Sequence, residues 1–416
     1  MPASPTPLSV AAASVTSTLT PLPVTWTPAA TFTPVATWTI EPTFTPIATW
    51  TTVPTFTPWP TITPTPTSTP TPDPAWRPQP PHTQVTGYGI QAHGEYRLDQ
   101  VVIAVHDLGL DWVKQQVRWE QIEGTQGVYG WAGLDHIVDT YTQTGFKVLL
   151  SVSTAPDWAR TDSAGNGPPD DYEDFTVFMR EMATRYKGRV HAYEIWNEPN
   201  LRREWEGAPL NAADYVRLLQ GAYRAIKSVD RRAIVVSAGL SPTAINDGVT
   251  AIDDRAYLHA MYDAGLAYAC DAIGSHPYGH ANPPEVYYEG GNYDPQRGWD
   301  DHPSYFFRNT MEDYYAIMVS HGDRYKRVWA TEFGWPTVDG MSVPPNPGQE
   351  YAADISEEQQ AAYTVRAFNW AHEWGHAGVM LLWSLNYWPV AGKESEMAKY
   401  SIVRWNWSPR RAYLAV

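Results

Sequence analysis

Cysteine, basic runs and long apolar runs are almost missing from this chain of 416 residues. Its one cysteine, Cys270, excludes intramolecular disulfides and multi-cysteine metal sites, and it leaves the redox compartment undecided. Only 29 Lys and Arg residues stand against 45 Asp and Glu residues, a formal net charge of −16, and no basic run occurs. Because phosphate backbones are bound by clustered basic side chains, nucleic acid is not expected as a partner. No stretch of 18 apolar residues is present, so no membrane-spanning helix is expected.

The first segment, residues 1–80, is too rich in proline and threonine to form a core. It contains 19 prolines and 23 threonines but only three charged residues. From Thr25 the chain runs through eight hexads with threonine at positions one and three, and the first six have Trp or Phe between them. A proline in every hexad removes strand hydrogen bonds and favours extended backbone. We expect a disordered Thr/Pro-rich tether, either a plain flexible linker or a stalk that holds a domain away from a cell envelope.

The location of the protein follows only indirectly from these features. The start of the chain has neither a basic n-region nor a long apolar h-region, so an export signal is not visible. The stalk-like segment nevertheless favours an extracellular or cell-surface protein, with the tether as its link to the envelope.

The rest of the chain, residues 81–416, alternates short apolar runs with longer stretches of helical period. This alternation is typical of a parallel sheet wrapped by helices. Eight strand–helix pairs predict an α/β fold, a (β/α)₈ TIM barrel, with insertions at 279–303 and 336–355. The eight strand candidates are residues 85–92, 112–119, 147–154, 191–198, 233–240, 271–278, 327–334 and 378–385.

Polar and aromatic residues follow several of these strands, where barrel enzymes place their chemistry. The fourth strand ends in Glu198 and the seventh carries Glu332, two strand-end glutamates beside aromatic residues. Strands three apart face each other across the mouth of a closed barrel. Retaining glycoside hydrolysis needs such a pair about 5–5.5 Å apart, one as acid and base and the other as nucleophile. We expect the charge of the nucleophile to raise the pKa of its neighbour and keep it protonated.

The segments around these glutamates resemble a known group of enzymes. YEIWNEPNL (193–201) and WATEFGW (329–335) are similar to the acid/base and nucleophile segments of the clan of retaining (β/α)₈ glycoside hydrolases. Family 39 is the most similar within it, because WNEPN is followed by Leu201 and Trp205 and the sixth strand carries SxHPY. The resemblance runs in order over roughly residues 85–405, and the tether has no counterpart in it.

The resemblance implies a role for each matching residue. Glu198 becomes the acid/base, Glu332 the nucleophile, and Asn197 the partner of the sugar 2-hydroxyl. The resemblance also implies that the Tyr278 hydroxyl contacts the nucleophile and that His276 lines the same wall of the site. The resemblance requires no metal and no cofactor, and the sequence contains no HExxH, GxSxG or GxGxxG that would indicate another chemistry.

Further side chains are expected around the sugar. Trp383 offers an apolar ring face to the sugar, and Arg118, at the end of the second strand, could orient Glu332. Trp335 and Trp158 are either subsite platforms or packing residues. Asp157 is read as a turn residue rather than a sugar contact.

Each residue also has a structural alternative. His276 could be a satisfied polar residue of the wall, and both glutamates could be paired with arginines. Glu194 is the more typical structural carboxylate, since it lies in the barrel interior and needs a cation such as Arg118.

Three functions remain open at this point. The first is a secreted or surface-tethered retaining β-glycoside hydrolase that acts on a polysaccharide or oligosaccharide. The second is a carbohydrate-binding barrel without catalysis, and the third is a transglycosidase that uses the same two glutamates. The sequence decides neither the sugar nor endo against exo action.

Overall fold

The computed structural model describes residues 80–162, 165–290 and 298–416. The tether expected over residues 1–80 therefore lies, except for Pro80, outside the described residues. Part of the insertion expected at 279–303 also lies outside them. Everything below concerns the barrel.

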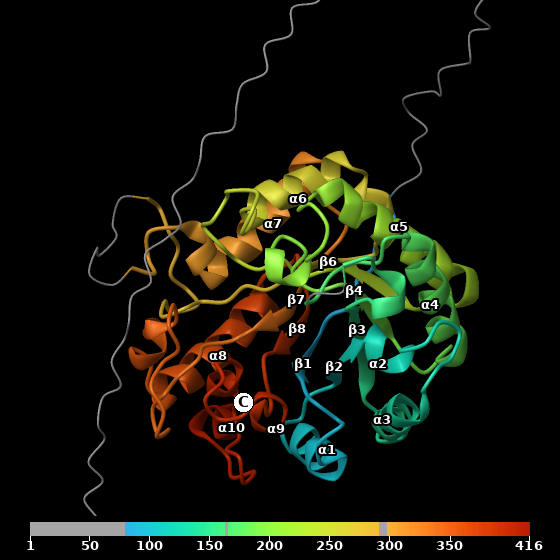
Figure 1. Ribbon diagram of the computed structural model, residues 1–416. Coiled ribbons are helices and arrows are strands. Elements are labelled where there is room, and N and C mark those ends of the chain that lie inside the picture. Colours follow the sequence, from blue (N-terminus) through green and yellow to red (C-terminus); the bar gives the residue numbers. More distant parts are fainter. Residues whose placement is uncertain (1–79, 163–164, 291–297) are drawn as a thin grey trace, which may run out of the picture. The chain divides into compact units, whose positions relative to one another are not determined.

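All eight predicted strands are present, and the (β/α)₈ fold is confirmed (Figure 1). The strands are β1 (Gly87–Gln91), β2 (Trp112–Arg118), β3 (Lys147–Ser153), β4 (Ala192–Ile195), β5 (Ile234–Ser237), β6 (Ile273–Ser275), β7 (Val328–Phe333) and β8 (Ala377–Leu382). They pair in parallel in the order β5-β4-β3-β2-β1-β8-β7-β6. Isolated parallel bridges, Val236 to Ala272 and Leu240 to Ser275, bring β5 and β6 together and nearly close the barrel.

Helices surround the strands in Figure 1, as expected when every strand is followed by a crossover. The α-helices are α1 (Leu98–Asp107), α2 (Trp119–Ile122), α3 (Ala132–Gln143), α4 (Tyr172–Arg185), α5 (Ala212–Val229), α6 (Asp254–Asp263), α7 (Phe307–Ser320), α8 (Glu357–Glu373), α9 (Trp388–Ala391) and α10 (Arg411–Ala415). The 3₁₀ turns are η1 (Asp157–Ala159), η2 (Arg202–Glu204), η3 (Leu266–Tyr268), η4 (Pro303–Tyr305), η5 (Glu350–Ala353) and η6 (Met397–Tyr400). A capping box formed by Ser356 and Gln359 begins α8.

Two apolar layers hold the barrel together. The larger one lies between the strands and the helices, and a smaller one fills the barrel interior. In the interior, the rings of Trp112 and Trp329 meet edge to face with centroids 5.4 Å apart. Alternate residues of a strand point inward. Lys114 and Glu194 therefore also point into the barrel, each two residues further along its strand than the interior residues Trp112 and Ala192. The interior is thus apolar below and charged above, toward the carboxyl ends of the strands.

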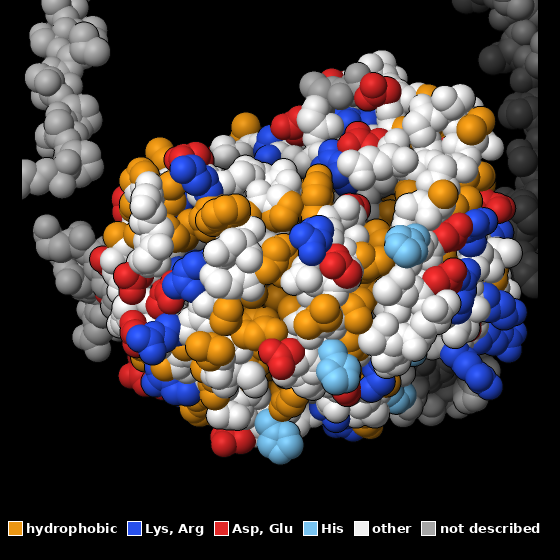
Figure 2. Space-filling model, turned by 90° about the horizontal axis from the view of Figure 1, so that it is seen from below, with side chains coloured by type: hydrophobic (Ala, Val, Ile, Leu, Met, Phe, Trp, Pro, Cys, Tyr) orange, Lys and Arg blue, Asp and Glu red, His pale blue; other side chains and the backbone are white. Residues whose placement is uncertain are grey.

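The outer surface mixes both signs of charge. On the face in Figure 2, Lys and Arg side chains stand near Asp and Glu, with apolar side chains between them. None of the helices in the described ranges is long and apolar enough to cross a bilayer.

Candidate active site

A cavity of about 520 Å³ opens where the strands end. The end of β2 and the loops that follow β3 to β8 contribute to its wall, as expected for a barrel that works at its carboxyl-terminal face. Its size falls within the range of sugar-sized ligand sites, roughly 300–1,000 Å³. Both strand-end glutamates, Glu198 and Glu332, line it.

The local backbone brings Glu198 to the mouth. Beyond β4 the chain turns sharply, with positive φ angles at Trp196 and at Glu198. The Glu198 amide donates to the Gly239 carbonyl at 3.1 Å, which ties the turn to the chain beyond β5. Gly239 is required there, because a Cβ atom would lie 2.1 Å from the His276 ring.

Glu332 is held by three donors from three other strands or loops. Lys114 Nζ lies 2.8 Å from Oε1, and the Tyr278 hydroxyl donates to Oε2 at 2.7 Å. With the Gln91 amide oriented to satisfy its neighbours, its nitrogen donates to Oε1 at 3.0 Å and its oxygen accepts from Trp383 Nε1 at 3.2 Å. The expected contact between Tyr278 and Glu332 is thus present, and the three donors together fix the orientation of the carboxylate.

The cation on this carboxylate is Lys114, and the expectation that Arg118 orients Glu332 is wrong. Lys114 is fully buried and also lies 2.8 Å from Glu194 Oε2, so it is the cation of the interior carboxylate as well. Arg118 instead contacts Glu120 at 2.7 Å and Asn166 at 3.0 Å on the cavity wall. The reason is the position of each residue along β2. Lys114 lies two residues after the interior residue Trp112 and so stays inside the barrel, whereas Arg118 ends the strand at the mouth.

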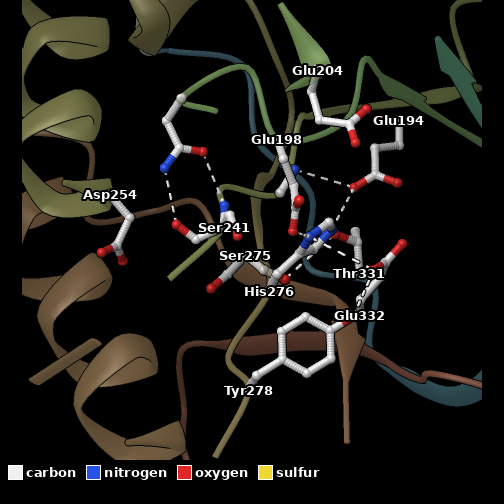
Figure 3. A network of polar contacts seen from close by, with 12 residues as sticks. Glu194, Glu198, Glu204, Ser241, Asp254, Ser275, His276, Tyr278, Thr331 and Glu332 are labelled. Carbon is white, nitrogen blue, oxygen red and sulfur yellow. Dashed lines mark hydrogen bonds and ion pairs between the residues drawn. The ribbon is translucent and has the colours of Figure 1, made fainter. Parts of the chain in front are cut away.

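A single imidazole nitrogen links the two glutamates. His276 Nδ1 lies 3.0 Å from Glu198 Oε1 and 3.7 Å from Glu332 Oε2 (Figure 3). Both oxygens lie close to the same nitrogen, so the distance from Glu198 Oε1 to Glu332 Oε2 cannot exceed the sum of these two distances. This limit includes the roughly 5–5.5 Å of retaining pairs and only just reaches the roughly 6.5–9.5 Å of inverting pairs.

Charged neighbours shift the pKa values of Glu198 and His276 in opposite directions. Burial opposes charge on Glu198, but the hydrogen bond to His276 and the charge of Arg203, whose Nη2 is 3.2 Å away, lower its pKa to about 2. Burial also opposes charge on His276, but Glu332, Glu194 and Glu198 raise its pKa to about 9. Our expectation that the charge of Glu332 keeps Glu198 protonated does not hold in this arrangement, because the sequence did not reveal these two cations.

Comparison with known proteins assigns the chain to a family. Residues 77–373 match the cellulase family, glycosyl hydrolase family 5. The chain belongs to this family. The predicted resemblance to (β/α)₈ glycoside hydrolases is thereby confirmed. The family whose model matches is family 5, and a family 39 enzyme is found among the similar structures.

Individual relatives of this family 5 chain carry several activities in their names. The β-xylosidase of Geobacillus stearothermophilus is 27% identical over 166 residues, 34% of this chain and 32% of that protein, so the chain matches about a third of this relative's length. A family 39 glycoside hydrolase from the gut symbiont Bacteroides cellulosilyticus WH2 has a TM-score of 0.60 at 18% identity, over 79% of this chain and 62% of the other. A glucosidase from Croceicoccus marinus has a TM-score of 0.54 at 12% identity, over 79% and 66%. These two structures show the fold.

The other predicted site residues of the family 5 barrel divide into two groups. Asn197, Tyr278 and Trp383 line the cavity, as does Arg118. His276 is completely buried and contacts the carboxylates, so it lies behind Glu198 instead of forming a sugar-facing wall.

Trp335 and Trp158, which the sequence left open as sugar-binding or packing residues, are packing residues, so their place among the candidate sugar-binding residues is corrected. Trp335 is 1% exposed and donates its indole N–H to the Asn282 carbonyl at 2.9 Å. Trp158 donates to the Glu123 carbonyl at 2.7 Å, and its ring packs edge-on against Trp119. Neither lines the cavity. Asp157 begins the η1 turn, as expected.

Sequence reasoning missed five residues of the site. Lys114 lies among other polar residues of β2, WVKQQVR, and like Arg203, Glu204, Glu396 and Gln91 it carries no local signal. Arg203 Nη2 contacts Glu198, its Nε lies 3.7 Å from Glu204, and its Nη1 lies 3.7 Å from Glu396 in the loop after β8. Because β4 and β8 are opposite strands of the barrel, this arginine spans its mouth.

Proposed function

We propose that this protein cleaves β-glycosidic bonds of an oligosaccharide or polysaccharide with retention of anomeric configuration. The observation that carries the proposal is the pair Glu198 and Glu332 on either side of one nitrogen of His276. Both carboxylates line a cavity large enough for sugar rings, and Trp383 lies in its wall. A binding barrel would need the aromatic wall but not two carboxylates supported by buried cations.

In the first step, Glu332 is the nucleophile. Its carboxylate attacks the anomeric carbon and forms an ester bond while the bond to the leaving oxygen breaks. Glu198 gives its proton to that oxygen, so the leaving group departs as an alcohol. Lys114, Tyr278 and Gln91 fix the orientation of the attacking carboxylate.

In the second step, water displaces the sugar from Glu332, and the same two glutamates take part. Glu198, now a carboxylate, takes a proton from water, and the water oxygen attacks the anomeric carbon as the ester bond to Glu332 breaks. Two displacements at one carbon restore the starting configuration, and Glu198 is again protonated.

The proton for the first step comes from the Glu198–His276 pair. The pair holds one proton, which lies on the histidine in the free site. Moving it across the 3.0 Å contact makes Glu198 the acid without changing the net charge of the pair. A sugar that displaces Arg203 from Glu198 favours this transfer, because the carboxylate then loses the charge that keeps it ionised.

This arrangement predicts the effect of His276→Asn. Because the pKa of His276 is raised to about 9, the pair holds its proton below this value and loses it as the pH rises through it. The wild type should therefore lose kcat/KM as the pH rises through about 9, and in H276N the loss should begin at lower pH. Activity on unactivated glycans should fall on the order of 10²–10³-fold, and much less on a dinitrophenyl glycoside, whose leaving group needs no acid.

His280→Asn is a matched control for this experiment. His280 lines the same cavity, and burial lowers its pKa to about 4, so it holds no proton near neutral pH. H280N should leave the alkaline limb where it is. If kcat/KM falls at the same alkaline pH in H276N as in the wild type, Glu198 and His276 do not share a proton.

The proposed function itself is tested by products. The full chain is incubated with β-linked xylan, glucan and mannan oligosaccharides, and the first anomer formed is recorded by proton NMR. A β-anomer as the initial product supports double displacement, whereas an α-anomer refutes it. Longer products would identify a transglycosidase, and binding without cleavage would identify a carbohydrate-binding barrel.

The tether and the location of the protein belong to the same proposal. An extracellular glycan substrate suits a barrel that residues 1–80 hold at a cell surface. The support for this part is compositional only.

A further inference from the structure

Arg203 contacts the acid/base from the open side of the cavity. Its Nη2 donates to Glu198 Oε2 at 3.2 Å, and its side chain is 60% exposed. The other oxygen of Glu198, Oε1, lies 3.0 Å from the ring of His276, which is completely buried. One oxygen of the acid/base therefore has its partner in the interior, and the other has its partner in the cavity.

The leaving group of the cleaved bond has to come close to this arginine. Its oxygen takes a proton from Glu198, so it approaches from the cavity and not from the side of the buried His276. In a sugar leaving group, the hydroxyls on the carbons beside that oxygen then come within reach of the guanidinium, which is 3.2 Å from Glu198. A guanidinium has five N–H donors and no acceptor, so it can donate to a sugar hydroxyl and still keep a carboxylate partner.

Two further carboxylates hold Arg203 over the cavity. Its Nε lies 3.7 Å from Oε1 of Glu204, the next residue of the η2 turn. Its Nη1 lies 3.7 Å from Oε1 of Glu396, which comes from the loop after β8. Both carboxylates line the same cavity. The guanidinium therefore keeps two partners when a sugar takes its place on Glu198.

From this geometry we infer that Arg203 binds the leaving-group sugar, by donating to a hydroxyl next to the bond that Glu198 protonates. The inference rests on the proposed function, since it requires Glu198 to be the acid/base. It makes a sugar a better leaving group for this site than an equally acidic alcohol without further hydroxyls.

The charges around Arg203 favour a neutral sugar in this position. Three carboxylates, those of Glu198, Glu204 and Glu396, lie within 3.7 Å of the one guanidinium. Its positive charge is therefore already balanced, and the carboxylate of an acidic sugar would meet like charges beside it. A neutral hydroxyl gains a charged donor without this repulsion.

The experiment compares two substrates in Arg203→Ala. One is a β-linked oligosaccharide of xylose, glucose or mannose from which the wild type releases one sugar, and the other carries trifluoroethanol in place of that sugar. Trifluoroethanol is about as acidic as a sugar hydroxyl, so both leaving groups need the acid. Both are measured near neutral pH, where the pair of Glu198 and His276 holds its proton.

The two substrates should respond differently. On the oligosaccharide, kcat/KM of R203A should fall about 10- to 100-fold, the factor of one hydrogen bond to a charged group. On the trifluoroethyl glycoside, it should change less than about threefold, because this leaving group has no hydroxyl to accept the bond. Arg203→Lys keeps one charged donor without the fork, so it should recover part of the loss on the oligosaccharide.

Arg118→Ala is the matched control. Arg118 lines the same cavity, but its ion pair is with Glu120, at 2.7 Å, instead of with a catalytic glutamate. Any change that R118A causes should be equal for the two substrates.

Two outcomes would overturn the inference. An equal loss on both substrates in R203A would show a general effect on Glu198, and no loss on either would show that the leaving-group sugar does not reach Arg203. If R203A is poorly folded by its thermal melting, R203K carries the test, since it must still lose more on the oligosaccharide than on the trifluoroethyl glycoside. Failure of the proposed function looks different, because the wild type would then cleave neither substrate.

Discussion

Replacing Glu332 by Gln should reduce kcat on the order of 10⁴–10⁶-fold, the scale seen when an enzyme loses its nucleophile. An amide has no charge with which to attack the anomeric carbon, although it has nearly the volume of the carboxylate. The variant should still fold, because Lys114 keeps Glu194 as a partner at 2.8 Å. Sugar affinity, measured by calorimetry, should change little.

The smaller variant Glu332→Ala separates a nucleophile from a merely polar residue. Azide can enter the space and attack the anomeric carbon of an aryl β-glycoside with a good leaving group, giving an α-glycosyl azide. In Glu198→Ala, azide should instead attack the glycosyl-enzyme and give the β-azide. The two product configurations distinguish the two roles, and exchanged configurations would show that the assignments are reversed. Turnover of E332Q within tenfold of the wild type would exclude Glu332 as the nucleophile.

Much of this fold could be predicted because its signals are local. Each strand is a short apolar run, each long helix carries one apolar face, and the box that begins α8 lies within four residues. The acid/base and nucleophile candidates were detectable for the same reason, since each glutamate stands at the end of its own strand. The structure places Glu198 and Glu332 on one cavity, as the order of the strands suggests.

The partners of these glutamates depend on contacts between distant strands. Lys114 and Arg118 lie four residues apart on the same face of one strand, and only their positions along the strand decide which of them reaches Glu332. Arg203 reaches Glu198 through a tight turn whose shape no pattern in the sequence announces. No sequence pattern announces the orientation of Trp335 either. It follows the seventh strand, where a tryptophan can bind sugar, but its indole N–H donates to the Asn282 carbonyl.

The largest effect on stability is expected at Lys114. Lys114→Met removes the cation nearest to both Glu194 and Glu332, 2.8 Å from each, and leaves these two buried carboxylates with only the more distant His276 ring, 3.8 and 3.7 Å away. Breaking a buried ion pair by removing one partner costs about 3–5 kcal/mol. We expect this loss in the free energy of unfolding, measured by urea titration. Turnover should fall as well, because Glu332 loses the donor at 2.8 Å that fixes its orientation.

Two comparisons show whether the buried charge is the cause. Lys147→Met removes a lysine from the neighbouring strand β3, where it is 42% exposed and 3.5 Å from Asp111, and it should cost less than about 1 kcal/mol. In Lys114→Met combined with Glu194→Gln, one of the two uncompensated carboxylates is gone, so more than half of the lost stability should return. Stability restored without turnover would mean that Lys114 serves the nucleophile as well as the fold. A loss in K114M no larger than that in K147M would refute the buried bridge, and with it the cation that we assign to the nucleophile.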